Sequence, residues 1–521
     1  MNTSGIIKST LAALIAVFSG WTTSPQDALP SYLTIELKRL AETWNILDSV
    51  SARIWPGWKD YVEVPFLFTY PNGVQMLVGH PAPLEGFTLV PGVELRGKKV
   101  YLDRRQEIRL AMTPPLHGGG GPIPLGRVNG KPVMVVRLQL TPLKASGGES
   151  GRDTPPEQWR VASENQILIN IHELFHCFQR SVFQPKHGNL RYNTDLNYAV
   201  YAEIEGRALE RAFLEADEPL TREYVKDFLV ARRLKRASMN EKEMLQESEE
   251  DVSEGTATYS DMMTTMLLQK NYSPGITPAD DPYFFKFQDA DSFRQAKVEM
   301  LRNSRANTLS SRDKCYTFGC FQALLLDRLA PGWKNDFFQQ AKMLDQVLDS
   351  VVGCAPEERI RVTERLRSRY GYDSLLAKHS PLTTRRDQAF EEVQKRKGLV
   401  FVVNFKNTLE YVYPQSKDTS YRVGLINIYP KGIGKIRIAD IVFEGKETPM
   451  VLDQLFYLKW IDTDAKATES NYEIQGDRQG AEGVYRNAVL KTRGFTLSAP
   501  MIRLRESRNR VKVNILSKLR E

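Results

Sequence analysis

The clearest regularity along the chain is the recurrence of apolar residues at helical spacing between residues 163 and 182. Ser163 and Gln166 fit the S-x-x-Q capping pattern of a helix N-terminus, and Pro185 limits the helix at its far end. Apolar residues at i, i+4, i+7 and i+11 lie on one face of such a helix. These four residues are Ile167, Ile171, Leu174 and Phe178.

The same spacing predicts further helices before and after this segment. They cover residues 32–55, 197–215, 221–237, 240–268, and a stretch from Phe321 that ends at Pro331. From about residue 195 to residue 360 the chain therefore reads as mostly helical.

Two regions have short runs of β-branched and aromatic residues instead, which is typical of strands. The clearest strands are Val64–Tyr70, Val74–Val78 and Val133–Leu140 in the first region, and Leu399–Phe405, Arg422–Ile428 and Val511–Ile515 in the second. The run from Gly118 to Pro124 lacks the lysine of a phosphate-binding loop and predicts a flexible loop. The strand at 133–140 either borders a substrate cleft or lies inside a sheet.

These patterns predict an α+β protein with four segments. Residues 1–28 form a signal peptide, 29–150 a β-rich part, 151–395 a helical region, and 396–521 a β-rich C-terminal domain, most simply a sandwich.

The signal peptide is predicted from Lys8 and the apolar run Leu11–Phe18, followed by small residues. This run is too short to span a bilayer, and no later stretch is apolar for long enough. We therefore expect a secreted or periplasmic protein without a membrane span.

Composition adds little to this picture. With 41% hydrophobic and 26% charged residues, the chain of 521 residues has the make-up of a globular protein. Its net charge of +8 arises from 71 basic and 63 acidic residues that are interspersed, so we expect no nucleic-acid partner. Of its four cysteines, Cys177 reads as a core residue. A disulfide among Cys315, Cys320 and Cys354 is open.

Candidate chemistry lies in the helix at 163–182, which contains His172-Glu173-Leu174-Phe175-His176. Positions i and i+4 of a helix share one face, so His172 and His176 can bind one metal ion. Glu173 lies beside the pair and can take a proton from a water molecule at the metal. A capped helix without metal is the alternative.

A catalytic zinc site usually has a third protein ligand. No histidine follows at the spacing of the longer H-E-x-x-H-x-x-G-x-x-H motif, so a carboxylate is expected. Two glutamates on later helices fit, Glu205 and Glu254, and each is followed by glycine and then, two positions later, alanine. We favour Glu254, because small Gly255 allows close approach to the metal helix. Glu205 is then an ion-paired residue, or one that orients a histidine.

On H-E-x-x-H and the later E-G-x-A pattern, residues of about 165 to 335 resemble the gluzincin metallopeptidases, the thermolysin-like superfamily. The resemblance implies a zincin-like fold and Zn²⁺ held by His172, His176 and a later glutamate. It also implies Glu173 as general base and then proton donor, with a peptide or protein as substrate. Tyr259 and Tyr316 are candidates for stabilising the oxyanion. The N-E-x-x-S-D form of thermolysin itself is missing.

Three hypotheses follow. The chain is a secreted zinc-dependent peptidase, a zinc-binding but catalytically altered binding or regulatory protein, or a structural helical protein without metal. Nothing in the sequence specifies an oligomeric state.

Overall fold

The structure is a computed structural model, and it describes the chain from residue 29 to residue 516 with gaps. The described residues are 29–70, 74–103, 121–139, 163–183, 196–268, 272–281, 290–306, 312–340, 342–381, 399–404, 421–423, 426–428, 433–436, 439–443, 457–462, 472–479, 483–493, 495–507 and 510–516. The predicted signal peptide and the predicted boundary near 395 lie outside them.

The chain divides into two compact units. The first unit comprises residues 1–185, 251–300 and 319–344, and the second comprises 186–250, 301–318 and 345–521.

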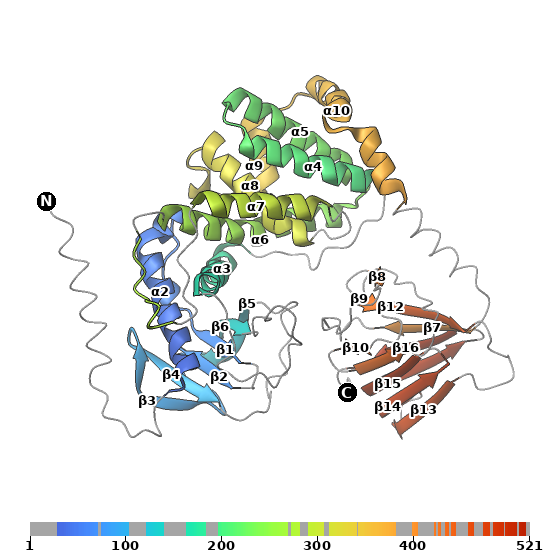
Figure 1. Ribbon diagram of the computed structural model, residues 1–521. Coiled ribbons are helices and arrows are strands. Elements are labelled where there is room, and N and C mark those ends of the chain that lie inside the picture. Colours follow the sequence, from blue (N-terminus) through green and yellow to red (C-terminus); the bar gives the residue numbers. More distant parts are fainter. Residues whose placement is uncertain are drawn as a thin grey trace. The chain divides into compact units, whose positions relative to one another are not determined.

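The first unit is built on a six-stranded sheet of order β3-β4-β2-β1-β6-β5 (Figure 1). All neighbouring strands are antiparallel except β1 and β6, which are parallel. The strands are β1 Phe66–Thr69, β2 Gln75–Val78, β3 Thr88–Leu95, β4 Lys98–Asp103, β5 Gly121–Val128 and β6 Lys131–Gln139.

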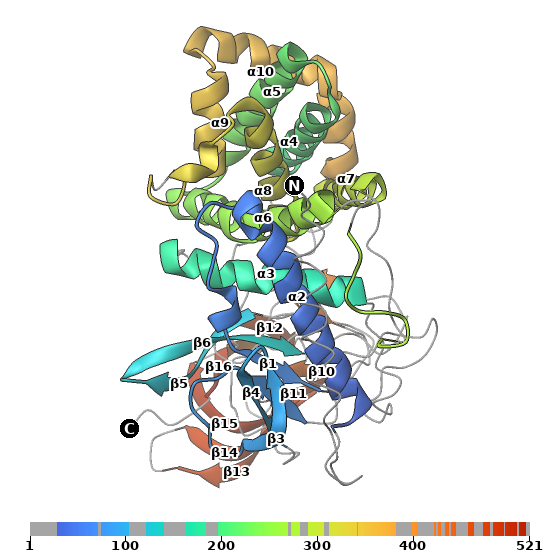
Figure 2. The same cartoon turned by 90° about the vertical axis from the view of Figure 1, so that its left-hand side faces the viewer.

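Besides this sheet, the first unit contains the helices α2 (Ser31–Ile54) and α3 (Ser163–Val182) (Figure 2). α3 begins at the predicted Ser163, and it packs against α2, β5 and β6. A buried polar chain joins the two helices, since Gln166 donates to Asn170 and Asn170 donates to Thr43 of α2, each at 3.0 Å. One face of the sheet carries an apolar cluster of Leu67, Leu77, Phe87, Tyr101, Leu125 and Val135.

Three long helices supply residues to both units: α6 (Glu241–Leu268), α7 (Ala290–Ala306) and α8 (Arg312–Leu329). Within the first unit, the backbones of α6 and α8 lie very close together. A Cβ atom on Gly319 would lie 2.0 Å from the Asp251 carbonyl oxygen and 2.7 Å from the Gly255 Cα atom. Small Gly255 therefore serves the packing of α6 on α8.

The second unit contains α4 (Leu196–Leu214), α5 (Glu218–Arg236), α9 (Leu344–Val352) and α10 (Pro356–Tyr370). Asp217 caps α5 by accepting a hydrogen bond from the Leu220 amide, and the basic residues at the other end of α5 suit the helix dipole. α5 is joined to α10 through Asp227, a buried carboxylate that accepts hydrogen bonds from Arg365, Arg369 and Tyr370.

The C-terminal region is β-rich, as predicted. Its described strands form one eight-stranded sheet and a separate pair, β8 with β9, rather than the two packed sheets of the expected sandwich. The long strand β15 pairs with β11, β14 and β16, which ties the strands into one sheet. The strands are β7 Leu399–Asn404, β8 Tyr421–Val423, β9 Ile426–Ile428, β10 Ile433–Ile436, β11 Ala439–Phe443, β12 Tyr457–Asp462, β13 Tyr472–Arg478, β14 Val484–Thr492, β15 Phe495–Ser507 and β16 Arg510–Ile515.

The protein is therefore a mixed α+β protein with a β-rich N-terminal part and a C-terminal sheet. All four cysteines are free, so no disulfide joins Cys315, Cys320 and Cys354. In the part of the chain that the structure describes, no helix is both long and apolar enough to cross a membrane.

Candidate metal centre

α3 presents His172 and His176 on one side and its apolar residues on another. Ile171, Leu174 and Phe175 are at most 1% exposed. Phe175 lies edge-on to Trp55 and Trp58, which follow α2 in the chain. The apolar stripe therefore fixes the rotation of the helix, and the two histidines are left partly buried on its other flank.

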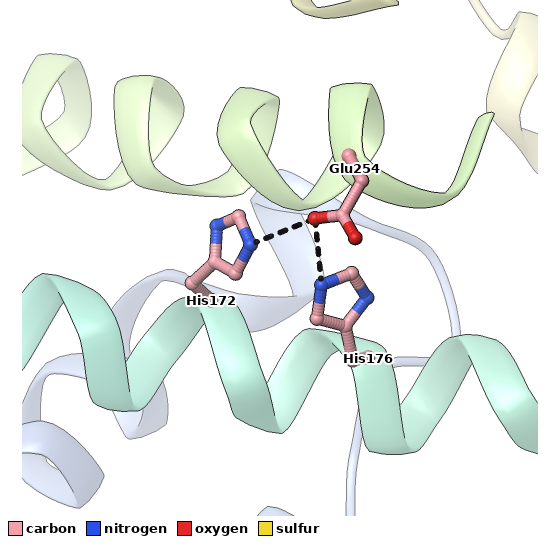
Figure 3. Close-up of side chains that lie close together, drawn as sticks. All are labelled: His172, His176 and Glu254. Atoms are coloured by element: carbon pink, nitrogen blue, oxygen red, sulfur yellow. Dashed lines mark ion pairs between the residues drawn. The ribbon is translucent and has the colours of Figure 1, made fainter. Parts of the chain in front are cut away.

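The third group at this position is Glu254 of α6, which faces both imidazole rings (Figure 3). Its Oε2 atom lies 3.6 Å from Nε2 of His172 and 3.4 Å from Nε2 of His176. One ligand atom from each of the three residues lies within 4.8 Å of the others, which is a spacing that could hold a metal ion. Two nitrogens and a carboxylate oxygen form a donor set that zinc accepts.

Each histidine is oriented through its other ring nitrogen. Nδ1 of His172 lies 3.1 Å from Oδ2 of Asp261, and Nδ1 of His176 lies 2.7 Å from Oε1 of Gln179. Both partners are acceptors, so each Nδ1–H donates and each Nε2 is directed at Glu254. Such hydrogen bonds fix the tautomer and the ring orientation of metal-binding histidines.

Gln179 connects His176 to the helix that carries Glu254. Its Nε2 atom donates to the Ser253 carbonyl at 2.9 Å and to Thr256 Oγ1 at 2.6 Å, with the Val252 carbonyl at 3.2 Å. Because all three neighbours of this nitrogen can accept, the amide has one orientation, with its oxygen toward His176. One buried side chain thus holds the second histidine and α6 together.

The charges at the centre stabilise one another. Burial lowers the pKa of His172, but the charge and hydrogen bond of Asp261, together with Glu254, outweigh it and raise this pKa well above its usual range. Burial raises the pKa of Glu254, yet the two histidines hold it well below the ordinary value. Without metal, these shifts favour the ionised form of Glu254 and the protonated form of His172.

Glu173 differs from Glu254 in its surroundings. It is 7% exposed, and its Oε2 atom is buried without a hydrogen-bond partner among the described residues. Burial raises the pKa of Glu173, and the nearby His176 and His172 only partly offset this effect. A carboxylate that is desolvated and has an unused oxygen beside the histidines is suited to exchange a proton with a bound molecule.

The alternative third residue, Glu205, is placed elsewhere. It lies on α4 in the second unit, fully buried, where Arg232 donates to it at 2.6 Å and Lys235 forms a second, short ion pair. Its neighbour Glu203 pairs with Arg207 one turn later, as the i,i+4 spacing predicts. Glu205 is thus an ion-paired residue, and the structure brings Glu254 to the histidines instead.

Of the two tyrosines considered for the oxyanion, Tyr259 is held by other residues. Tyr259 is fully buried, donates to Asp327 at 2.5 Å and accepts from Lys334 at 2.6 Å. It follows Glu254 by five residues, which turns it about 140° round α6. Tyr316 belongs to the segment of α8 in the second unit.

Strand β6, which covers the predicted strand at 133–140, is an interior strand. It pairs with β1 on one side and β5 on the other, so β5 is the edge strand of this sheet beside α3. The predicted loop at Gly118–Pro124 is wrong from residue 121 onwards, because Gly121–Pro124 begins β5. Prolines are tolerated at a sheet edge where the missing N–H would face away from the partner strand.

Sequence reasoning missed the two residues that orient the histidines. Asp261 follows Glu254 by seven residues and Gln179 follows His176 by three, so both spacings keep each pair on one helix face. These spacings are the only signals for them in the sequence, and they are weak ones.

Comparison of this chain with known family models, with curated proteins and with solved structures finds no match. The function of the site is therefore inferred from its own residues.

Proposed function

We propose that the protein is a secreted zinc-dependent peptidase of gluzincin type. The observation that carries the proposal is the convergence of His172 Nε2, His176 Nε2 and Glu254 Oε2 beside the unpartnered carboxylate oxygen of Glu173. This arrangement combines three metal-binding groups with a separate acid–base group.

The donor set fits zinc. Tetrahedral zinc with bonds of about 2.0–2.1 Å separates its ligand atoms by roughly 3.3 Å. The distances of 3.4 and 3.6 Å from Glu254 to the two histidine nitrogens are close to this value. When bound, zinc supplies a Lewis acid that lowers the pKa of a water molecule and polarises a carbonyl group.

Glu173 is the residue that moves the proton. Its carboxylate accepts a proton from water as the water oxygen attacks the carbonyl carbon of the peptide bond. The same proton is then delivered to the leaving nitrogen when the carbon–nitrogen bond breaks. Asp261 and Gln179 keep the two imidazoles in place during these changes, because their hydrogen bonds do not involve the nitrogens that face the metal.

A first test measures zinc in the purified full-length protein and hydrolysis of a labelled, denatured protein substrate. Zinc should be present at one ion per chain. A chelator should abolish hydrolysis, and added zinc should restore it. Glu173→Gln keeps the size of the side chain but cannot take the proton, so it should retain zinc and lose most of the turnover. Wild-type turnover in this variant would contradict the assigned role.

A second candidate is a zinc-binding protein that does not hydrolyse peptides. The position of Tyr259 favours this candidate. Its hydroxyl is already hydrogen-bonded to Asp327 and Lys334, so it is not available to stabilise an oxyanion at the site. Bound zinc without chelator-sensitive hydrolysis would select this candidate, and absence of zinc would exclude both.

A further inference from the structure

The edge of the sheet beside the metal helix carries two prolines. β5 is the last strand of the sheet, and α3 packs against β5 and β6. Pro122 pairs with Val136 and Pro124 with Met134 across the β5–β6 ladder. The direction in which the backbone groups of these prolines point determines whether the sheet edge can bind a peptide as an added strand.

The direction follows from Val136. Its amide donates to the Pro65 carbonyl at 2.8 Å, on the β1 side of β6, so Val136 does not hydrogen-bond to β5. Pro122 and Val136 are therefore a non-hydrogen-bonded pair, and the Pro122 carbonyl points away from β6. Pro124, two residues later, has the same orientation. In the stretch from Gly121 to Pro124, the two residues whose backbone groups point away from β6 are thus both prolines, which have no N–H to donate.

One of the two outward carbonyls is already bound. Nη1 of Arg180, on α3, donates to the Pro122 carbonyl oxygen at 2.6 Å. Within this stretch, an added strand would find no donor and only the Pro124 carbonyl as acceptor. Binding of a peptide as an extra strand depends on both kinds of main-chain hydrogen bond, so β5 is closed to it here.

Arg180 itself lies on the metal side of α3. Counted from His172 at 100° per residue, His176 is turned by about 40°, Arg180 by about 80° and Glu173 by about 100°. Arg180 follows His176 by one turn and is exposed. Its guanidinium has five N–H donors in a planar fork, and the bond to Pro122 uses one of them and fixes the group in place.

We propose that the substrate is anchored by a carboxylate that pairs with Arg180, and not by its backbone laid along β5. This proposal rests on the peptidase function proposed above. A guanidinium pairs with a carboxylate through two parallel hydrogen bonds, which gives both strength and direction. The carboxylate is either the C-terminus of the substrate or an Asp or Glu side chain near the cleaved bond.

The competing explanation is that Arg180 only joins α3 to β5. Such a role predicts altered stability in Arg180 variants but no preference among substrates. A test must therefore compare substrates that differ in one carboxylate.

The probe is a synthetic peptide mixture of random sequence, prepared once with free C-terminal carboxylates and once with C-terminal amides. Cleavage positions are read by mass spectrometry, and KM is measured on the best-cleaved peptides. If the C-terminus is the anchor, free acids should be cut near their ends and amides poorly. If a side chain is the anchor, both forms should be cut next to Asp or Glu. Cleavage at positions unrelated to any carboxylate would overturn the proposal.

Variants assign the preference to one residue. Arg180→Gln should raise KM for carboxylate-bearing peptides by about 10- to 100-fold, which is the loss of one charge-assisted pair, while kcat changes less. Arg180→Lys should restore part of this loss. Arg127→Gln is the matched control, because Arg127 is an exposed arginine on β5 that donates to the Gly130 carbonyl. It should keep the wild-type preference, and an equal loss there would contradict the assignment.

A third variant tests the edge itself. Pro124→Ala returns one outward N–H to β5, so KM for long amidated peptides should fall. In wild type, KM should not fall as amidated peptides are lengthened, and a steady fall would show that the backbone is bound. All of these outcomes against Arg180 as the anchor require that peptides are cut. Failure of the proposed peptidase function looks different, because then no peptide of either form is cut although zinc is bound.

Discussion

Replacement of Gln179 by methionine tests whether one amide holds the metal centre together. Methionine has a similar length, so the change removes polar groups and leaves the packing largely intact. Two N–H donors and one acceptor are lost, and these serve the Ser253 carbonyl, Thr256 and His176. At a net ~1 kcal/mol per bond, with more for buried groups left unpaired, the metal-free protein should lose about 2–4 kcal/mol.

Zinc affinity should fall as well. Loss of the group that orients a metal-bound histidine typically costs about 10–100-fold, and here the same change also loosens α6 and Glu254. Affinity is measured by competition with a chromophoric chelator, and stability by urea unfolding of the chelated protein. Thr256→Val is the control, because it removes one bond of the Gln179 amide but leaves the bond to His176 in place. If Gln179→Met binds zinc as tightly as wild type, Gln179 has no part in positioning the ligands.

Two further predictions concern single groups. Glu254→Ala should abolish tight zinc binding, whereas Glu205→Ala should keep zinc but destabilise the protein by about 3–5 kcal/mol, because the buried Arg232 and Lys235 each lose one of their two carboxylate partners; zinc titration and melting curves check both, and the reverse pattern would exchange the two roles. Burial, and then repulsion by another lysine, lowers the pKa of Lys314 from 10.5 to about 8. Between these values the unfolded chain binds more protons, so stability should rise with pH. Melting curves of Lys314→Met should lack this rise, and a wild type whose stability falls over that range would contradict the assignment.

The part of the site that could be predicted from sequence is the part that one helix determines. His172, Glu173 and His176 need only the geometry of α3, and the apolar stripe of that helix fixes which side they occupy. Glu254 lies 78 residues after His176 and depends on how α6 crosses α3, so the sequence left it open against Glu205. Asp261 reaches His172 only through the same crossing, and contacts with α6 also set the orientation of the Gln179 amide, so the local spacings are weak signals for both residues.

The fold shows the same division. Long amphipathic helices and alternating strands were predicted close to their observed bounds, as for the helix at 32–55 and α2. The strand β5 was not, because glycine and proline at 118–124 resemble a turn. An edge strand tolerates proline on its outer side, and only the pairing with Val136 and Met134 shows that this is such a strand. The eight-stranded C-terminal sheet likewise follows from which strands pair with β15, and strand patterns do not contain that information.

The contact between Gly319 and α6 has a consequence for how natural variants of this protein are read. Any side chain at position 319 would meet the Asp251 carbonyl and the Cα atom of Gly255, the residue next to Glu254. α6 or α8 would have to shift, and any shift of α6 would displace Glu254, the proposed third metal ligand. A chain that keeps every metal-binding residue but carries alanine at 319 could thus have lost the centre. When related proteins are judged for the same function, a glycine at position 319 should therefore be checked together with the H-E-x-x-H motif.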